Sequence, residues 1–315
     1  MPDAVQFSVV IPVFRNRESI PELVERLAGL FESLHGTCEA VFVIDGSPDD
    51  SVEVLRRSLS VVPLPAQVIE LSRNFGSFAA IRVGLEAATG EYCGVMAADL
   101  QEPVELMEDF FTEMAAGKAD IVIGQRASRR DSPLSSLSSR IFWGFYRRWI
   151  NRDIPPGGVD VFGCTREVSQ RLAGLAETHT SLIGLLFWIG YRRSLIEYDR
   201  LPRATGKSGW TLRKRLRYLF DSVYAFTDLP VVALQVIGLV GFAASLAIGA
   251  IVFIAWLAGG ISSPGYTPVM LVLTGSTSLI LIALGVVGSY VWRGYENSKG
   301  RPVAITMRAE SFNLD

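Results

Sequence analysis

Residues 231–257 read VVALQVIGLVGFAASLAIGAIVFIAWL, a run without a single charged side chain. It lies in a longer stretch, residues 229–292, that has no Asp, Glu, Lys or Arg at any of its 64 positions. Glycines and prolines at 259–268 divide this stretch into two spans. At about 1.5 Å per residue, the second span, 269–292, reaches about 36 Å, enough to cross a hydrocarbon core of about 30 Å. The sequence therefore predicts a membrane hairpin, and a pair of buried core helices is the alternative.

Basic side chains lie on both sides of the uncharged stretch. They are Arg213, Lys214, Arg215 and Arg217 before it, and Arg293, Lys299 and Arg301 after it. The loop between the two spans carries no charge, so the positive-inside rule places both flanks in the cytoplasm. Residues 1–3 lead straight into a strand-like run, and we expect no signal peptide. The chain is therefore expected to be a multi-pass protein of the inner (plasma) membrane with its large N-terminal region in the cytoplasm.

The N-terminal region alternates strand-like and helix-like patterns. The expected strands are 7–13, 40–44, 68–71, 92–97 and 121–123, and the expected helices are 20–34, 54–59, 78–88 and 103–116. Alternation of this length indicates an α/β fold, a mostly parallel sheet with helices on both faces. Ligands of such sheets bind at the carboxyl ends of the strands.

Composition excludes several classes of protein. A net charge of −2 over 315 residues lacks the basic signature of a nucleic-acid binder. Three widely spaced cysteines fit neither a zinc site nor a disulfide framework, and two histidines leave little room for a histidine metal site. No G-x-G-x-x-G follows the first strand, which argues against a dinucleotide dehydrogenase. The sequence Gly206-Lys207-Ser208 lacks the first glycine of a P-loop, because residue 201 is leucine.

Acidic and amide side chains follow two of the expected strands. The second strand runs into Asp45-Gly46-Ser47, and the fourth runs into Asp99-Leu100-Gln101. A carboxylate on such a turn can bind a ribose hydroxyl or a base edge. The oxygens of Asp99 and Gln101 suit a hard cation, Mg²⁺ or Mn²⁺, that completes its shell with diphosphate and water. Each motif alone is equally compatible with an ordinary turn or a helix cap.

Six segments in order resemble family 2 glycosyltransferases of the polyprenyl-phosphate branch. That branch includes dolichyl-phosphate mannose synthase and the bacterial enzymes that glucosylate undecaprenyl phosphate. The segments are VVIPVF (9–14), VIDGS (43–47), LSRNFG (71–76), ADLQEP (98–103), GQR (124–126) and GGVD (157–160). The likeness continues through RATGKS (203–208) and the hairpin, so it covers nearly the whole chain.

The resemblance implies a GT-A (Rossmann-like) fold, a nucleotide-sugar donor, a divalent metal and a polyprenyl phosphate acceptor. By position, the donor residues would be Pro12, Asp45, Arg73, Asp99 and Gln101, with Asp99 and Gln101 also holding the metal. Asp99 and Asp160 would be the catalytic residues, and Arg126, Arg203, Lys207 and Ser208 would bind the acceptor phosphate. A lipid monophosphate is mostly dianionic at neutral pH, so inverting attack needs no strong base, and Asp160 would orient the sugar or a basic side chain.

Two departures from the family pattern leave alternatives open. The family has aspartates at the positions of Ile44 and Ala97. A UDP-glucose-like donor is favoured, but the donor could be shifted to GDP-mannose or an amino-sugar nucleotide. The chain could also be a weak or inactive membrane-tethered paralogue. A processive polysaccharide synthase is disfavoured, because its extra spans and its Gln-x-x-Arg-Trp sequence are missing.

Two further stretches, residues 134–150 and 210–229, combine apolar and basic residues as interfacial amphipathic helices do. Packing on the soluble core is the alternative for both. We expect four parts: a nucleotide-sugar-binding core (1–130), an acceptor side with the interfacial helices (131–228), a transmembrane hairpin (229–292) and a cytoplasmic tail (293–315). The expected partners are a nucleotide sugar, a polyprenyl phosphate lipid, the membrane and a second copy of the chain in a homo-oligomer, but no nucleic acid.

Overall fold

The computed structural model describes residues 4–127, 144, 147–148, 151–155, 158–175, 177, 180–201, 212–258 and 266–314. The chain divides into two compact units. Met1–Leu216 and Arg301–Asp315 form the first, which we call the sheet unit. Arg217–Gly300 forms the second, which we call the helical unit. Each is described by itself below.

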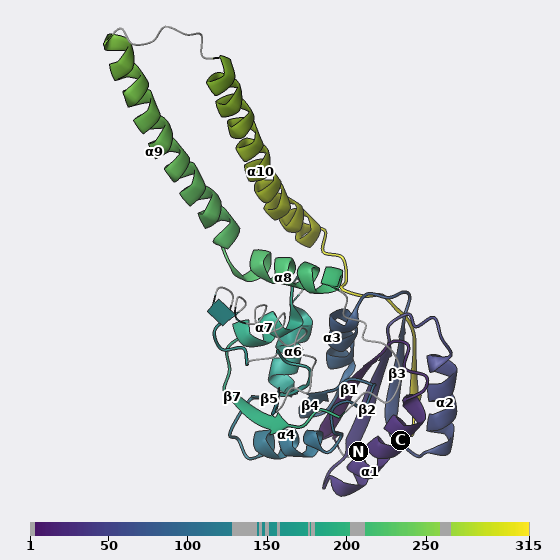
Figure 1. The fold of residues 1–315 in the computed structure, drawn as a ribbon. Coiled ribbons are helices and arrows are strands. Elements are labelled where there is room, and N and C mark those ends of the chain that lie inside the picture. The colour runs from purple at the N-terminus through teal and green to yellow at the C-terminus, as the bar shows by residue number, and fades with distance from the viewer. Residues whose placement is uncertain are drawn as a thin grey trace. The chain divides into compact units, whose positions relative to one another are not determined.

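An eight-stranded sheet forms the centre of the sheet unit within the described residues, in the order β7-β5-β6-β4-β1-β2-β3-β8 (Figure 1). The strands are β1 (Phe7–Val13), β2 (Cys38–Ile44), β3 (Ala66–Leu71), β4 (Tyr92–Val95), β5 (Ile121–Arg126), β6 (Phe162–Thr165), β7 (Arg193–Tyr198) and β8 (Thr306–Phe312). Only β6 and β8 run antiparallel to their neighbours. The predicted α/β class with a mostly parallel sheet is confirmed.

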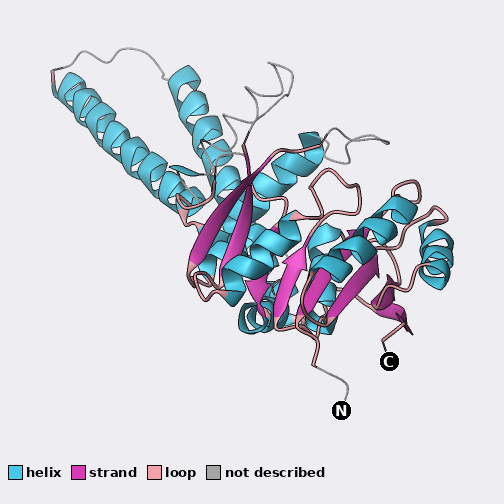
Figure 2. Cartoon of the chain, turned by 90° about the horizontal axis from the view of Figure 1, so that it is seen from below, coloured by secondary structure: helices cyan, strands magenta, loops and turns pink. Residues whose placement is uncertain are grey.

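Helices cover both faces of this sheet (Figure 2). They are α1 (Ile20–Ser33), α2 (Ser51–Val61), α3 (Ser77–Ala87), α4 (Leu106–Ala115), α6 (Arg166–Gly174) and α7 (Leu182–Trp188). The apolar spacing of α1 buries Leu23 and Leu27 in one core cluster with Phe42 of β2. On the other face, α3 packs closely on β1, because a Cβ at Gly84 would lie 2.3 Å from Val10 Cγ1.

The last strand was not anticipated from the sequence, which predicted only a tail after residue 292. Strand β8 pairs antiparallel with β3 over the register Ala66↔Phe312 to Leu71↔Thr306. Arg56 of α2 forms ion pairs with both Glu70 of β3 and Glu310 of β8. The chain therefore leaves the sheet unit after Leu216 and returns to it at Arg301.

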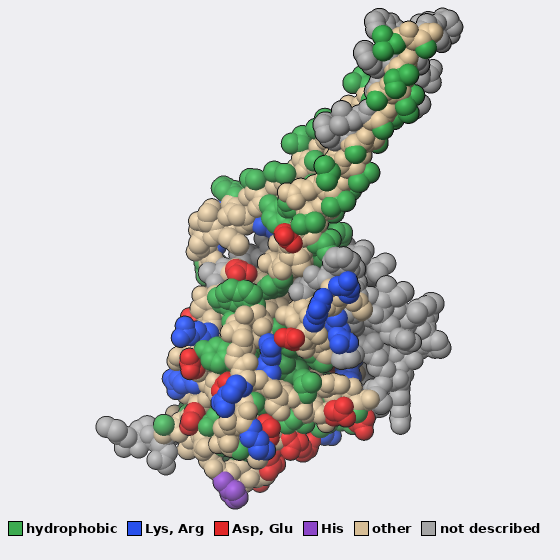
Figure 3. All heavy atoms as spheres, turned by 90° about the vertical axis from the view of Figure 1, so that its left-hand side faces the viewer, with side chains coloured by type: hydrophobic (Ala, Val, Ile, Leu, Met, Phe, Trp, Pro, Cys, Tyr) green, Lys and Arg blue, Asp and Glu red, His purple; other side chains and the backbone are tan. Residues whose placement is uncertain are grey.

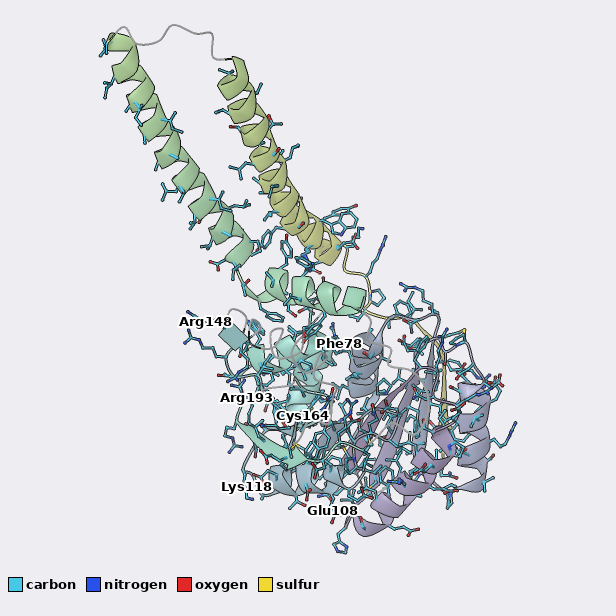
Figure 4. All side chains as sticks on the ribbon, in the orientation of Figure 1. Phe78, Glu108, Lys118, Arg148, Cys164 and Arg193 are labelled. Atoms are coloured by element: carbon cyan, nitrogen blue, oxygen red, sulfur yellow. The ribbon has the colours of Figure 1, made fainter. Side chains whose placement is uncertain are left out.

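The helical unit consists of the end of α8 (Leu212–Phe226) followed by α9 (Leu229–Leu257) and α10 (Tyr266–Ser298). The two long apolar helices occupy the two predicted spans. Hydrophobic side chains project outward along both, and α10 exposes more than half of Leu281 and Val291 (Figures 3 and 4). Within the described residues, Gly275–Ser298 is long and apolar enough to cross a membrane. A second candidate exists if Tyr218–Phe226 and Leu229–Gly241, which meet at 77°, count as one span.

Contacts within the helical unit fix where α10 meets α8. Arg293 of α10 donates to the Asp221 carboxylate at 2.8 Å, and its guanidinium lies 4.9 Å from the centre of the Tyr224 ring. The Tyr290 hydroxyl donates to the Thr227 carbonyl at 3.2 Å. The predicted helix in 210–229 is confirmed by α8, whereas most of 134–150 lies outside the described residues.

Candidate functional site

One edge of the sheet collects most of the predicted site residues that the structure describes. Strands β1, β2, β4, β5 and β7 all end at this edge, and antiparallel β6 begins there. Asp45 follows β2, and Asp99 lies four residues beyond the end of β4. Arg126 ends β5, and Asp160 lies two residues before β6. The edge has two halves, one around Asp45 and one around Asp99 and Asp160.

The second half is a cluster of charged and polar side chains, which we call the charged cluster. Its members are Asp99, Gln101, Glu102, Arg126, Asp160, Tyr198 and Arg200. They come from the segment after β4, the ends of β5 and β7 and the segment before β6. Three of them, Glu102, Tyr198 and Arg200, were not predicted as site residues. Glu102 lay within a quoted motif, but nothing in its spacing revealed that it is buried.

An ion pair joins two predicted residues, Arg126 Nη2 and Asp160 Oδ2. The Arg126 side chain is 18% exposed and that of Asp160 is 33% exposed, so the pair lies at the rim of the edge. Arg126 thus forms a link between the acidic side chain and the strand end. This arrangement suits Asp160 to orienting a basic side chain, the role expected for it.

Glu102 lies deepest in the charged cluster and is only 1% exposed. Its Oε1 lies 3.4 Å from Arg200 Nε, yet neither carboxylate oxygen accepts a hydrogen bond from a described residue. Burial raises the pKa of Glu102 to about 7, and the neighbouring carboxylates of Asp160 and Asp99 also raise it, against the lowering effect of Arg200 and Arg126. The same burial raises the pKa of the Tyr198 hydroxyl.

Arg200 ties the charged cluster to the segment that follows β7. Its Nη2 donates to Gln101 Oε1 at 2.7 Å, and the Leu201 amide donates to the Gln101 carbonyl at 2.8 Å. The guanidinium therefore bridges Gln101 and the buried carboxylate of Glu102. The predicted acceptor residues Arg203, Lys207 and Ser208 follow within a few positions but lie outside the described residues.

The predicted metal ligands occupy a tight turn at the end of β4. The backbone N–H of Gln101 donates to Asp99 Oδ1 at 3.4 Å, and Leu100 between them has φ of 54°. Ser19 Oγ donates to the Ala98 carbonyl at 2.6 Å and anchors the turn to the start of α1. Among the residues that the structure describes, no three His, Cys, Asp or Glu side chains are grouped in a way that could hold a metal ion. Two oxygen ligands fit Mg²⁺ or Mn²⁺ only if substrate oxygens and water supply the rest.

The other half of the edge is built around Asp45, which is 2% exposed. Its Oδ1 accepts from the Phe75 amide at 2.7 Å, and its Oδ2 accepts from the Gly76 amide at 2.9 Å. Burial raises the pKa of this carboxyl, while the two amides and Arg73 lower it. Asp45 therefore holds the 72–76 loop, and we call this part of the edge the Asp45 half.

Arg73 and Gly46 complete the Asp45 half. Arg73 is exposed, and its guanidinium stacks 3.9 Å from the centre of the Phe75 ring. Gly46 has φ of +56°, and a Cβ there would lie 2.4 Å from the Arg73 carbonyl carbon, so only glycine fits without a shift. Pro12 lies half-buried near the end of β1, paired with Val43.

The two departures from the family pattern lie in different surroundings. Ile44 is 2% exposed and belongs to the hydrophobic core cluster that α1 and α2 cover. Ala97, in contrast, is half-buried just before the Asp99 turn. The apolar side chain at position 44 therefore packs in the core, on the far side of the strand from the Asp45 contacts.

The chain is similar in sequence to known glycosyltransferases. Residues 8–173 match the model of the glycosyl transferase family 2. An uncharacterized glycosyltransferase of Synechocystis, sll0501, is 30% identical over 95% of this chain and 94% of its own. The bactoprenol glucosyl transferase of Shigella phage SfV is 29% identical over 95% of this chain and 97% of its own. The solved mannosyltransferase PcManGT from Pyrobaculum calidifontis, in complex with GDP-Man and Mn²⁺, covers 93% of this chain and 91% of its own at 18% identity, with a TM-score of 0.46.

Proposed function

The chain belongs to the family 2 glycosyltransferases, and from that premise we propose that it transfers a sugar from a nucleotide donor to a polyprenyl phosphate. The observation that carries this proposal is the charged cluster, where Arg126 and Arg200 meet carboxylates at a GT-A-like sheet edge. The same chain carries two long apolar helices that suit a lipid-linked acceptor. Similarity to bactoprenol glucosyl transferases over nearly the full length supports the same acceptor class.

The donor would bind across the two halves of the edge. The exposed guanidinium of Arg73 and the loop that Asp45 holds are suited to the nucleoside end, with Pro12 beneath them. Asp99 and Gln101 would take the diphosphate end together with Mg²⁺ or Mn²⁺, which would neutralise the charge that develops on the leaving diphosphate. UDP-glucose is the favoured donor, because the bactoprenol glucosyl transferases, which are named for glucose, are similar to this chain over nearly its full length. GDP-mannose and amino-sugar nucleotides are the alternatives.

The acceptor phosphate would lie at the charged cluster. One of its oxygens attacks the anomeric carbon as the bond to the nucleoside diphosphate breaks, and the diphosphate leaves with the electron pair. Because the phosphate is already ionised, no side chain needs to remove a proton. The guanidiniums of Arg126 and Arg200 offset the repulsion between the two anions, and Arg203, Lys207 and Ser208 would add to this. Asp160 orients Arg126 through their ion pair, and in-line attack inverts the anomeric carbon.

The chain path supports a membrane hairpin. Both ends of the helical unit join the sheet unit, so a chain that crosses a membrane within 217–300 must cross it an even number of times. Basic residues at both flanks favour the cytoplasmic side for the sheet unit. We therefore infer a hairpin that keeps the charged cluster on the face where nucleotide sugars occur. Self-association of the chain stays a prediction from the sequence.

A donor panel tests this proposal. Purified protein would be mixed with undecaprenyl phosphate and, in turn, UDP-glucose, GDP-mannose and UDP-N-acetylglucosamine, with Mg²⁺ or Mn²⁺ present. Mass spectrometry should detect one lipid-linked monosaccharide, and we expect UDP-glucose to give it. Nucleotide binding without transfer from any donor would instead support the inactive paralogue that Ile44 and Ala97 suggested.

A further inference from the structure

The C-terminal strand β8 pairs with β3, the strand that leads into the 72–76 loop of the Asp45 half. We propose that β8 is a positioning element of the donor site, which holds the 72–76 loop in the conformation that binds the nucleotide. This inference rests on the proposed function and adds to it a part of the chain outside the residues that the family model matches. It makes donor binding depend on the last residues of the chain.

The first contact lies where β3 ends and the loop begins. The β3–β8 ladder shifts register between Glu70 and Leu71, so the backbone bends at this point. Beyond the shift, the Ser72 amide donates to the Ile305 carbonyl at 2.9 Å. This bond extends the strand pairing by one step into the loop, and it fixes the backbone directly before Arg73.

The second contact fixes the other end of the same loop. The amides of Phe75 and Gly76 donate to the two carboxylate oxygens of Asp45, and Asn74 Nδ2 donates to the Asp45 carbonyl at 3.1 Å. Arg73 therefore lies between two anchors, Ile305 on one side and Asp45 on the other. A side chain on a loop whose backbone is held at both ends loses less freedom when it binds an anion than one on an untethered loop.

Strand β8 is itself fastened at several points. Arg56 pairs with Glu310 at 2.7 Å and also with Glu70, which joins α2, β3 and β8 in one ionic group. At the far end of the strand, Asn313 Nδ2 donates to the Leu64 carbonyl at 3.2 Å, and Phe312 packs against the hydrophobic core. The strand is therefore an integral part of the sheet, and its contact with Ser72 is a fixed support.

The chain path connects the helical unit to the loop that β8 supports. Residues 299–305 join the end of α10 to β8, so the return from the helical unit leads directly to the loop that carries Arg73. The outward path begins after β7 and Arg200, at the charged cluster. The helical unit is thus connected in sequence to both halves of the edge, to the charged cluster through α8 and to the Asp45 half through β8.

The test measures nucleotide affinity in full-length protein and three variants. The first variant ends at residue 302 and lacks β8. The second is Ser72→Pro, which removes the amide that donates to Ile305, fixes φ at that position and leaves β8 in the chain. The control is Met307→Ala, which changes an exposed side chain of β8 and leaves its backbone intact. Calorimetry with UDP and Mg²⁺ gives the dissociation constant, and thermal unfolding reports whether each variant is folded.

We expect the truncated protein and Ser72→Pro to bind UDP at least about fivefold more weakly, and Met307→Ala to bind like the wild type. A synthetic peptide of residues 303–315 should restore the truncated protein by pairing with β3. If the truncated protein does not fold, Ser72→Pro decides. Folded Ser72→Pro with wild-type affinity would overturn the inference. Wild-type protein that binds neither UDP nor GDP would instead contradict the proposed function.

Discussion

The two halves of the sheet edge both contain a buried carboxylate, but the two carboxylates are satisfied in opposite ways. Asp45 is 2% exposed, and each of its oxygens accepts a backbone amide. Glu102 is 1% exposed, and its oxygens face Arg200 without a hydrogen bond from any described residue. Buried ions without hydrogen bonds are costly, whereas amide-bonded carboxylates stabilise a loop. The carboxylate of the Asp45 half is therefore fully hydrogen-bonded and has a structural role. The buried carboxylate of the charged cluster lacks hydrogen bonds from described residues, which suits a site that binds a ligand.

Asp99 lies in the charged cluster at the turn nearest the proposed reaction, and its replacement should have the largest effect. Asp99→Asn removes a negative charge expected to hold the metal and diphosphate, so transfer should fall by at least about 10²-fold. The fold should persist, because the side chain is half-buried and not in the core. Initial rates with UDP-glucose, with thermal unfolding as the control, check this. Near-normal turnover of Asp99→Asn would contradict a role for Asp99 in holding the metal and diphosphate.

Arg200 tests whether the charged cluster acts on the acceptor. Arg200→Ala leaves Glu102 buried without its ionic partner and frees Gln101, so we expect transfer to fall by about 10–100-fold and stability by about 1–3 kcal/mol. Arg192→Ala is the matched control, because that arginine also pairs with a carboxylate, that of Asp120, but 63% of its side chain is exposed. Initial rates measured against lipid phosphate concentration give KM for the acceptor. This KM should rise for Arg200→Ala and stay unchanged for Arg192→Ala.

Replacement of Asp45 tests the role of the Asp45 half. In Asp45→Asn the amide nitrogen would face a backbone N–H, so one hydrogen bond is lost and the unfolding free energy should fall by about 1–3 kcal/mol. UDP affinity should weaken with it, while KM for the lipid phosphate should not change. Ile44→Val, one position away in the core, should cost about 0.5–1.5 kcal/mol and leave UDP affinity intact. Equal effects of both variants on UDP binding would contradict a role for the Asp45 loop.

Glu102 should give the smallest effect, a change in the pH dependence of stability. Its pKa is about 7 in the folded chain against 4.5 for an ordinary glutamate, so the folded state binds more protons than the unfolded state between these pH values. Stability from this group is therefore present at low pH and lost as pH rises through about 4.5–7, by about 3 kcal/mol. Glu102→Gln should flatten that slope. Denaturant unfolding without added metal, at several pH values, measures it.

Local patterns were enough to predict much of the fold. Strands β1 to β5 and helices α1 to α4 lie within a few residues of their predicted positions, because their apolar spacing is strong. Strand β8 was missed, since TMRAESF is short and mostly exposed, and its partner β3 lies more than 230 residues earlier in the chain. Edge strands of this kind form through pairing, which no local pattern records.

Predictions about the site followed the same division. The strand pattern located Asp45 and Asp99 at one edge, because the ends of parallel strands meet there. Asp160 was expected near them only from the family resemblance, since it precedes β6, an antiparallel strand that was not predicted. The motifs did not show that the Asp45 carboxylate accepts hydrogen bonds from two backbone amides or that Glu102 is buried, since both depend on contacts with distant segments. Ile44 was interpreted as a lost site carboxylate, but its environment is the core, which only the alternation of the folded strand makes visible.

The stereochemistry of the lipid product tests the central claim most directly. Transfer from UDP-α-glucose to undecaprenyl phosphate by in-line attack at the charged cluster must invert the anomeric carbon. Proton NMR of the purified product should therefore show a β-linked glucosyl phosphate on the lipid. An α-linked product would contradict the single in-line displacement, and free glucose without any lipid-linked sugar would contradict the proposed acceptor.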